Sequence, residues 1–274
     1  MRTLAKGLAR ARLRSGSLVP VETRYARPPS MAAAESPPFD VATARSVEPD
    51  PRTLADNRVI VDERSVASVA YKMLRTRVLQ RMRRNGWQSI AVTGTCPGEG
   101  KSLTAVNLSI SLARDVGTSV VLADLDFRKP SLHRHLGVGT RYGIGDFLRG
   151  AVALEEVAVS PGVERLAVLM NERSFSGSSE MLASPQTANL VKRVTQGAGR
   201  IAVFDLPPVL ASDDMLAFAP LVDAVLVVVA QGTTRHADMV AARDLLQNVN
   251  IVGVVLNRSS ELVAPYYYYG GATR

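Results

Sequence analysis

Short hydrophobic runs alternate with helical patterns along most of this chain. Six of the runs are apolar at consecutive positions, which is typical of strands that are buried on both faces of a sheet. These predicted strands cover residues 89–93, 119–123, 166–169, 201–204, 224–229 and 251–256. The stretches between them have helical spacing, most clearly at residues 101–115, 185–195, 215–218 and 236–248. Buried strands that alternate with helices predict a doubly wound α/β domain with a mostly parallel sheet.

One longer amphipathic helix is predicted before the first strand, over residues 63–84. Its apolar side chains recur at helical spacing and are Val66, Val69, Ala70, Met73, Leu74 and Val78. The chain before this helix is rich in proline, alanine and serine and has no such period. We therefore expect residues 1–56 to form a disordered leader and linker. The folded domain is expected to span residues 57–262, and residues 263–274 are expected to form a flexible tail.

Composition and charge narrow the class of protein. The chain has 274 residues, 46% of them hydrophobic, and its longest apolar runs are far shorter than the ~20 residues of a membrane helix. The single cysteine, Cys96, rules out an internal disulfide and fits a reducing cytoplasm. Part of the net charge of +8 lies in the first 19 residues, which carry five cations and no acid. This leader could lie on anionic lipid as a basic helix or remain disordered, and it lacks the interleaved aromatic residues that favour nucleic-acid binding.

A glycine-rich segment, TGTCPGEGKS, follows the first predicted strand at residues 93–102 and opens a helix. Glycines allow backbone N–H groups to surround a phosphate, and the helix N-terminus adds positive potential. In this arrangement Lys101 reaches the terminal phosphates of a nucleotide, and Ser102 is placed to bind Mg²⁺. The strict phosphate-loop pattern requires glycine at position 95, where this chain has Thr95. The predicted nucleotide-binding residues of the segment are Pro97, Gly98, Glu99, Gly100, Lys101, Ser102 and Leu103.

Three aspartates lie at or just past the carboxyl ends of two predicted strands. Asp124 and Asp126 are two residues apart, so in extended chain they point the same way. Asp205 ends the strand that begins near residue 201. In doubly wound sheets the ligand lies beyond the carboxyl ends of the strands, where the phosphate segment is also expected. Carboxylates at this edge suit Mg²⁺ or its water ligands. The sequence therefore predicts a site for ATP and Mg²⁺.

Residues 65–269 resemble the bacterial tyrosine kinases (BY-kinases) that regulate capsule and exopolysaccharide export. The resemblance rests on PGEGKS at 97–102, DLDFRKPSLH at 124–133, GIGDFL at 143–148, SEMLAS at 179–184, FDLPP at 204–208 with Asp213 and Asp214, GVVLN at 253–257, and the tyrosines of the tail. A missing first glycine in the phosphate segment is usual in that family. The resemblance implies a P-loop NTPase fold of the partition and cell-division ATPase type, used to phosphorylate tyrosine.

The resemblance also implies roles for individual residues. Asp124 would act as the catalytic base, Asp126 would share Mg²⁺ with Ser102, and Asp205 would complete the metal shell. Lys101 would act on the transferred phosphate, and Asn257 and Arg258 at the end of the last strand would join the nucleotide site. The phosphate acceptors would be four adjacent tyrosines that can extend into the site of a neighbouring subunit, Tyr266, Tyr267, Tyr268 and Tyr269.

Partners follow from the same resemblance. The chain has no membrane helices of the fused family members, so it is similar to the split type, which a separate membrane-embedded polysaccharide co-polymerase activates from the cytoplasmic side of the membrane. The ring-closing motif of the family is only partly present, because its aligned positions are Val69, Lys72 and Arg75. Two alternatives remain open, a partition or positioning ATPase and a scaffold that binds ATP without transferring phosphate. A partition ATPase has no reason to carry the four tyrosines, whereas the sequence does not exclude the scaffold.

Overall fold

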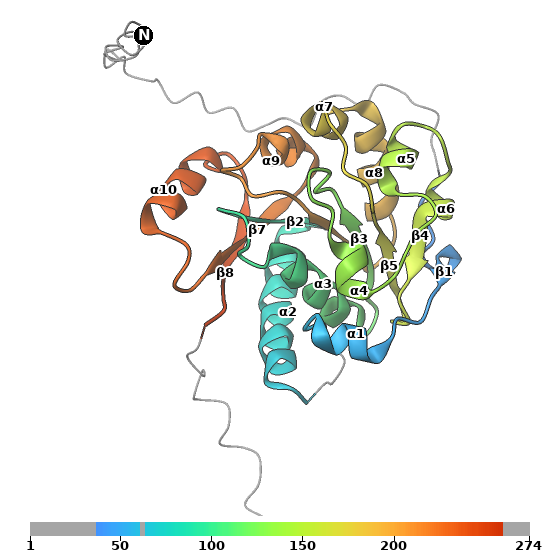
Figure 1. The fold of residues 1–274 in the computed structure, drawn as a ribbon, viewed down its shortest axis with the longest axis horizontal. Helices are drawn as coiled ribbons and strands as arrows, with labels where there is room; N and C mark the ends of the chain where they lie inside the picture. The colour runs from blue at the N-terminus through green and yellow to red at the C-terminus, as the bar shows by residue number, and fades with distance from the viewer. Residues whose placement is uncertain (1–36, 61–63, 260–274) are drawn as a thin grey trace, which may run out of the picture.

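The computed structural model describes residues 37–60 and 64–259, which form an eight-stranded sheet covered by helices on both faces (Figure 1). The strands are β1 (Arg45–Ser46), β2 (Ser89–Gly94), β3 (Ser119–Asp124), β4 (Ala158–Ser160), β5 (Leu166–Leu169), β6 (Arg200–Asp205), β7 (Ala224–Ala230) and β8 (Ile251–Asn257). Their order across the sheet is β1-β4-β5-β3-β6-β2-β7-β8. Neighbouring strands in this described sheet are parallel, except that β4 is antiparallel to β5. The predicted doubly wound, mostly parallel α/β fold is therefore confirmed.

The helices lie between these strands along the chain. They are α1 (Pro51–Asp56), α2 (Val66–Asn85), α3 (Lys101–Ala113), α4 (Leu132–Leu136), α5 (Ile144–Leu148), α6 (Leu154–Val157), α7 (Ser178–Leu182), α8 (Pro185–Thr195), α9 (Asp214–Phe218) and α10 (His236–Leu245), with short 3-10 turns η1 (Val41–Thr43) and η2 (Ala219–Leu221). Each helix and strand expected from the hydrophobic pattern is present, with ends shifted by at most a few residues. No helix among these described segments is long and apolar enough to cross a bilayer.

The apolar core lies on both faces of the central strands. On one face, α2 and α3 lie side by side and bury residues such as Leu79 and Leu108 against the sheet (Figure 1). On the other face, α8, α9 and α10 contribute residues such as Leu190, Phe218 and Ala242. Every residue of β2 and β7 is buried, which explains the uninterrupted apolar run of β7 and the consecutive apolar residues in the middle of β2.

Residues 37–56, which we expected to belong to the linker, are instead part of the folded domain. Phe39 is only 1% exposed and packs in the core, and β1 pairs with β4 at the edge of the sheet. Asp50 accepts hydrogen bonds from the first backbone N–H groups of α1, and Pro51 occupies its first turn. These elements are two to six residues long, too short to produce a period in the sequence. The rest of the predicted leader, residues 1–36, lies outside the described residues.

Candidate active site

The segment between β2 and α3 wraps around the N-terminus of α3 and is called the phosphate-binding loop here (residues 94–102). Gly98 and Gly100 have φ angles of +85° and +88°, a left-handed conformation that favours glycine. At Gly100 a side chain would also collide with the amide of Asn257. The backbone N–H groups at the start of a helix favour an anion, so the loop has the form expected of a phosphate site.

Glu99 holds this loop together from inside. Its carboxylate is 1% exposed and accepts hydrogen bonds from the backbone N–H groups of Thr95 at 2.6 Å and Cys96 at 3.0 Å. The hydroxyls of Thr95 and Thr234 donate to the same carboxylate. The departure from glycine at position 95 thus has a structural reason, because a threonine there supplies a second donor to Glu99. Glu99 was predicted to bind the nucleotide, but in this geometry its side chain binds the loop.

The end of β8 supports the loop from the other side. The side-chain amide of Asn257 donates to the carbonyl of Glu99 at 2.9 Å, and the guanidinium of Arg258 donates to the carbonyl of Gly98 at 2.6 Å. Both residues were predicted to join the nucleotide site, and both lie beside the phosphate-binding loop. The predicted acceptors, Tyr266 to Tyr269, lie outside the described residues, which end at Ser259.

Lys101 lies between two of the predicted aspartates. Its Nζ atom is 2.6 Å from Asp126 Oδ2 and 3.7 Å from Asp205 Oδ1, and the three side chains are 12%, 5% and 0% exposed. Burial alone would lower the pKa of Lys101, but the carboxylates of Asp205 and Asp126 outweigh it and raise this pKa. Lys101 is therefore a firmly charged cation, held by groups that a bound phosphate and metal can replace.

Asp124 and Asp205 are direct neighbours across strands β3 and β6. Asp124 accepts hydrogen bonds from the backbone N–H groups of Ser131 and Leu132 at 2.9 and 3.1 Å, which fixes its carboxylate at the start of α4. Burial, together with the charge of Asp205, raises the pKa of Asp124 well above its usual value. Burial also raises the pKa of Asp205, although Lys101 opposes this effect. Two carboxyls with raised pKa at one strand edge are typical of a functional site.

Asp205 is paired by charge with Lys101 but lacks a close hydrogen-bond partner. Both of its carboxylate oxygens are buried, and neither has a hydrogen-bond partner among the described residues. Ser102, in the first turn of α3, lies beside it, and Asp126 completes a set of oxygen ligands. Mg²⁺ takes few protein ligands and keeps water and phosphate oxygens, so a serine and two aspartates fit it. No cluster of three His, Cys, Asp or Glu side chains is preformed as a metal centre within residues 37–60 and 64–259.

A second carboxylate near the site, Asp214, has contacts that the sequence did not predict. Asp214 is completely buried and accepts hydrogen bonds from Arg128 at 3.0 Å, Ser178 at 2.7 Å and Ser212 at 3.0 Å. Arg128 itself is half exposed and lies just past β3. The charge of Asp126 contributes to raising the pKa of Arg128, after the larger effect of Asp214. The structure thus holds a guanidinium beside Asp126, at the place just past the strand end where the sequence suggested that Arg128 could steady phosphates or an acidic tail. The hydrogen bonds that Asp214 accepts were not predicted.

Comparison with known proteins supports a nucleotide-binding domain. Residues 90–263 match the family model described as CobQ/CobB/MinD/ParA nucleotide binding domain. The tyrosine-protein kinase YwqD of Bacillus subtilis (strain 168) is 27% identical over 214 residues, which cover 77% of this chain and 90% of YwqD. The succinoglycan biosynthesis transport protein ExoP of Rhizobium meliloti (strain 1021) is 31% identical over 74% of this chain, which spans only 26% of ExoP. The crystal structure of the VpsO kinase domain superposes with a TM-score of 0.63 at 28% identity, covering 71% of this chain and 96% of that domain.

Proposed function

The chain belongs to the CobQ/CobB/MinD/ParA nucleotide-binding domain family and, within it, to the bacterial tyrosine-protein kinases, and from this we propose that it phosphorylates the tyrosine cluster of its own tail with ATP. The observation that carries the proposal is the position of Lys101, which lies between Asp126 and Asp205 at the edge where the phosphate-binding loop meets β3 and β6. A cation and three acids at a phosphate site suit phosphoryl transfer.

ATP would bind with its phosphates along the loop. The N–H groups at the start of α3 would bind the phosphates, and Lys101 would exchange its contact with Asp126 for one with the terminal phosphate. Asp126, Asp205 and Ser102 are the residues that would hold Mg²⁺. When bound, Mg²⁺ supplies positive charge that stabilises the phosphate oxygens during transfer.

Asp124 would take the proton of the attacking tyrosine. In this step the phenol oxygen bonds to the γ-phosphorus, the bond from that phosphorus to the bridging oxygen of ADP breaks, and the phenol proton moves to Asp124. Burial raises the pKa of Asp124 and therefore makes its carboxylate a stronger base than an exposed aspartate. Arg128 at the rim, held by Asp214, would steady the phosphate or the tail.

The acceptors Tyr266 to Tyr269 would enter the site of a neighbouring copy, which links transfer to self-association. The name of ExoP associates that protein with succinoglycan transport. By this likeness we assign the chain to the control of exopolysaccharide or capsule synthesis, with a membrane-embedded co-polymerase as activator and the cytoplasmic side of the membrane as its place.

Intact-mass measurement tests this function. The full chain is incubated with Mg-ATP and a candidate activator, and phosphate is mapped to tryptic fragments. We expect added phosphate on the fragment that contains Tyr266 to Tyr269, and none in the variant with phenylalanine at these four positions. Release of inorganic phosphate without any labelled tail would instead favour a partition-type ATPase. Phosphate on other tyrosines only would refute the assignment of the tail.

A further inference from the structure

The last strand of the sheet, β8, has a face that the described residues leave open. It stands at the end of the strand order, beyond β7 (Figure 1). Val254 and Leu256 of β8 are 63% and 57% exposed. Their register partners in β7, Val227 and Val229, are buried in the core cluster to which α10 contributes. Because paired residues of neighbouring strands point to the same face, α10 covers β7 but leaves two aliphatic side chains of β8 open.

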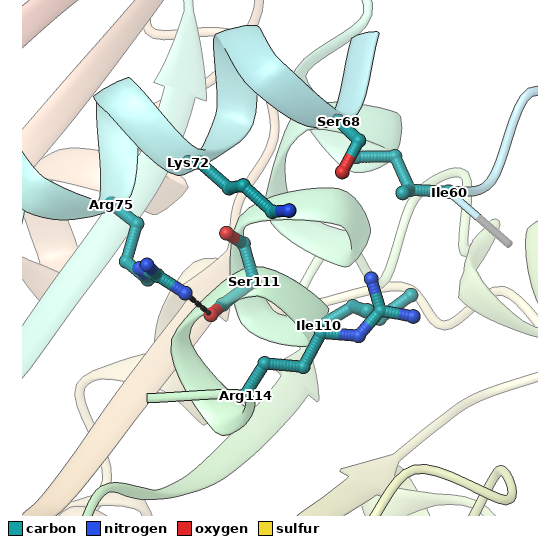
Figure 2. Close-up of a pocket in the computed structure, with 7 residues that line it drawn as sticks. All are labelled: Ile60, Ser68, Lys72, Arg75, Ile110, Ser111 and Arg114. Carbon is teal, nitrogen blue, oxygen red and sulfur yellow. Dashed lines mark hydrogen bonds between the residues drawn. The ribbon is translucent and has the colours of Figure 1, made fainter. Parts of the chain in front are cut away.

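The opposite face of β8 is already covered by α2. Val252 and Val255 pack in the core cluster on that side, and Arg81 of α2 donates a hydrogen bond to the carbonyl of Val252. The helix is in turn fastened to α3, because Arg75 donates to the carbonyl of Ser111 at 3.1 Å beside the small pocket drawn in Figure 2. A segment that docks on β8 must therefore use its free edge and the face on the side of α10.

The backbone groups of Val254 and Leu256 point to the free edge of β8. The carbonyl of Asn257 accepts a hydrogen bond from the N–H of Gln231, which directly follows β7. Asn257 therefore faces β7, and because successive residues of a strand direct their backbone groups to opposite edges, Leu256 and Val254 face away from it. No further strand of the described sheet lies beyond β8, so these N–H and C=O groups can pair with an added strand.

The chain's own continuation fits this edge. Residues 262–269 read LVAPYYYY, contain no charged side chain, and are rich in the tyrosine and valine that favour strands. Arg258, the first residue after β8, has a φ of +56°, in the left-handed region that short hairpin loops use. Its N–H donates to the side chain of Asn257 at 2.9 Å, which helps to hold this conformation. Eight extended residues span about 26 Å, enough to line a strand of about 23 Å.

We propose that, before any phosphate is transferred, residues 262–269 dock on β8 of the same chain as an antiparallel strand. Pro265 decides the register, because it has no N–H and must face away from β8. Residues of even number then lie opposite Val254 and Leu256 and on the same face of the sheet. The residues that turn toward the open face are Leu262, Ala264, Tyr266 and Tyr268, whereas Tyr267 and Tyr269 turn to the other face.

The docked tail holds its tyrosines away from the site of a neighbouring copy, so docking and insertion exclude each other. The proposal thus goes beyond the proposed function and adds a resting place for the acceptors. A phosphate on Tyr266 or Tyr268 would carry about −1.5 to −2 charges onto an apolar surface and would release the tail. A modified tail would then stay off β8, because two aliphatic side chains cannot satisfy the phosphate oxygens.

Hydrogen exchange at the free edge tests the proposal. NMR follows the amides of Val254 and Leu256 in the full chain without nucleotide. We expect exchange at least about tenfold faster in the variant Tyr266→Asp with Tyr268→Asp than in the wild type, because charge on the open face undocks the tail. The matched control, Tyr267→Asp with Tyr269→Asp, has the same charge on the other face and should exchange like the wild type.

A second pair of variants tests the face of β8 itself. Leu256→Lys should speed the exchange of the Tyr266 amide, because the tail loses its apolar contact. Val116→Lys changes another exposed aliphatic residue, which lies outside β8 and is 89% exposed, and should leave this exchange unchanged. Thermal unfolding by circular dichroism checks that each variant is folded.

Several results would overturn the proposal. Equal exchange in the wild type and in Tyr266→Asp with Tyr268→Asp would do so, as would an unchanged Tyr266 amide in Leu256→Lys. Faster exchange in the control Tyr267→Asp with Tyr269→Asp would contradict the register. Protection that is lost on about 100-fold dilution would mean that the tail of a second copy binds, because docking within one chain is independent of protein concentration. Nucleotide is absent throughout, so a negative result leaves phosphoryl transfer to its own test.

Discussion

Replacement of Asp205 by asparagine should make the nucleotide-free protein more stable while it removes activity. Asp205 is fully buried, neither of its oxygens has a hydrogen-bond partner among the described residues, and Asp124 is its direct neighbour in the sheet. Asparagine keeps the shape but removes the negative charge, whose burial raises the pKa of Asp205; a tenfold change in this ionisation equilibrium corresponds to about 1.4 kcal/mol. Part of this would be offset because Lys101, 3.7 Å away, loses one of its two carboxylates. We therefore expect a net gain of about 1–2 kcal/mol in the free energy of unfolding, or roughly 2–8 °C in Tm.

The sign of this effect follows from the pKa of Asp205. Burial raises this pKa in the folded chain, so the ionised carboxylate is less favourable there than in the unfolded chain. The cost is absent at a pH below the usual aspartate pKa, grows as pH rises toward the raised value and is complete above it. The stability gain of Asp205→Asn should therefore be full only above the raised pKa and vanish below the usual aspartate pKa.

Thermal unfolding by circular dichroism, with EDTA and without nucleotide, measures the effect. The matched control is Asp223→Asn. The Asp223 carboxylate accepts hydrogen bonds from Gln88 and Ser89, so this substitution should lower the stability of the protein. Addition of Mg-ATP at about 100 times its Kd should stabilise the wild type by about 2.7 kcal/mol and the Asp205→Asn variant much less. If Asp205→Asn were clearly less stable than wild type without ligands, the carboxylate would already be satisfied, and the reasoning would fail.

Three further predictions concern neighbouring groups. Lys101→Ala should remove phosphate uptake by the tail, because the terminal phosphate of ATP loses its fixed cation. Mass spectrometry measures the phosphate on the tail, and phosphate retained there in a folded variant would contradict the assignment of Lys101 to the nucleotide site. Asp124→Asn should keep its affinity for ATP, measured by calorimetry, but lose phosphate transfer to tyrosine. The transfer rate of the wild type should rise with pH as the raised pKa of Asp124 is passed. An unchanged transfer rate in the variant would exclude Asp124 as the base. Glu99→Gln should weaken ATP binding about tenfold, because an amide cannot accept hydrogen bonds from all four donors. Thr234→Val should weaken ATP binding less, because the two backbone N–H donors to Glu99 remain. An affinity of Glu99→Gln for ATP equal to that of the wild type would mean that the loop needs no such support.

The sequence predicted the central sheet well because its strands are buried on both faces, so their apolar runs stand out. Asp124, Asp126 and Asp205 were identified for a related reason, since strand ends in a parallel sheet share one edge. Contacts between distant segments were not predictable. Glu99 meets Thr234 across 135 residues, and Arg128 meets Asp214 across 86, and no local pattern marks either pair. The segment at residues 37–56 was missed because a single buried ring, Phe39, anchors elements that are too short for a period.

The support of the phosphate-binding loop by Asn257 and Arg258 sets a boundary for protein engineering. These two residues end the last strand, and the tyrosine cluster follows them by only eight residues. A tail exchange or truncation that cuts before Asn257 would remove the two donors to the loop carbonyls of Glu99 and Gly98, and would therefore damage nucleotide binding as well as the acceptor. A cut after Ser259 leaves both donors in place. We therefore expect a tail exchanged at that point to leave the two donors to the loop, and with them nucleotide binding, unchanged.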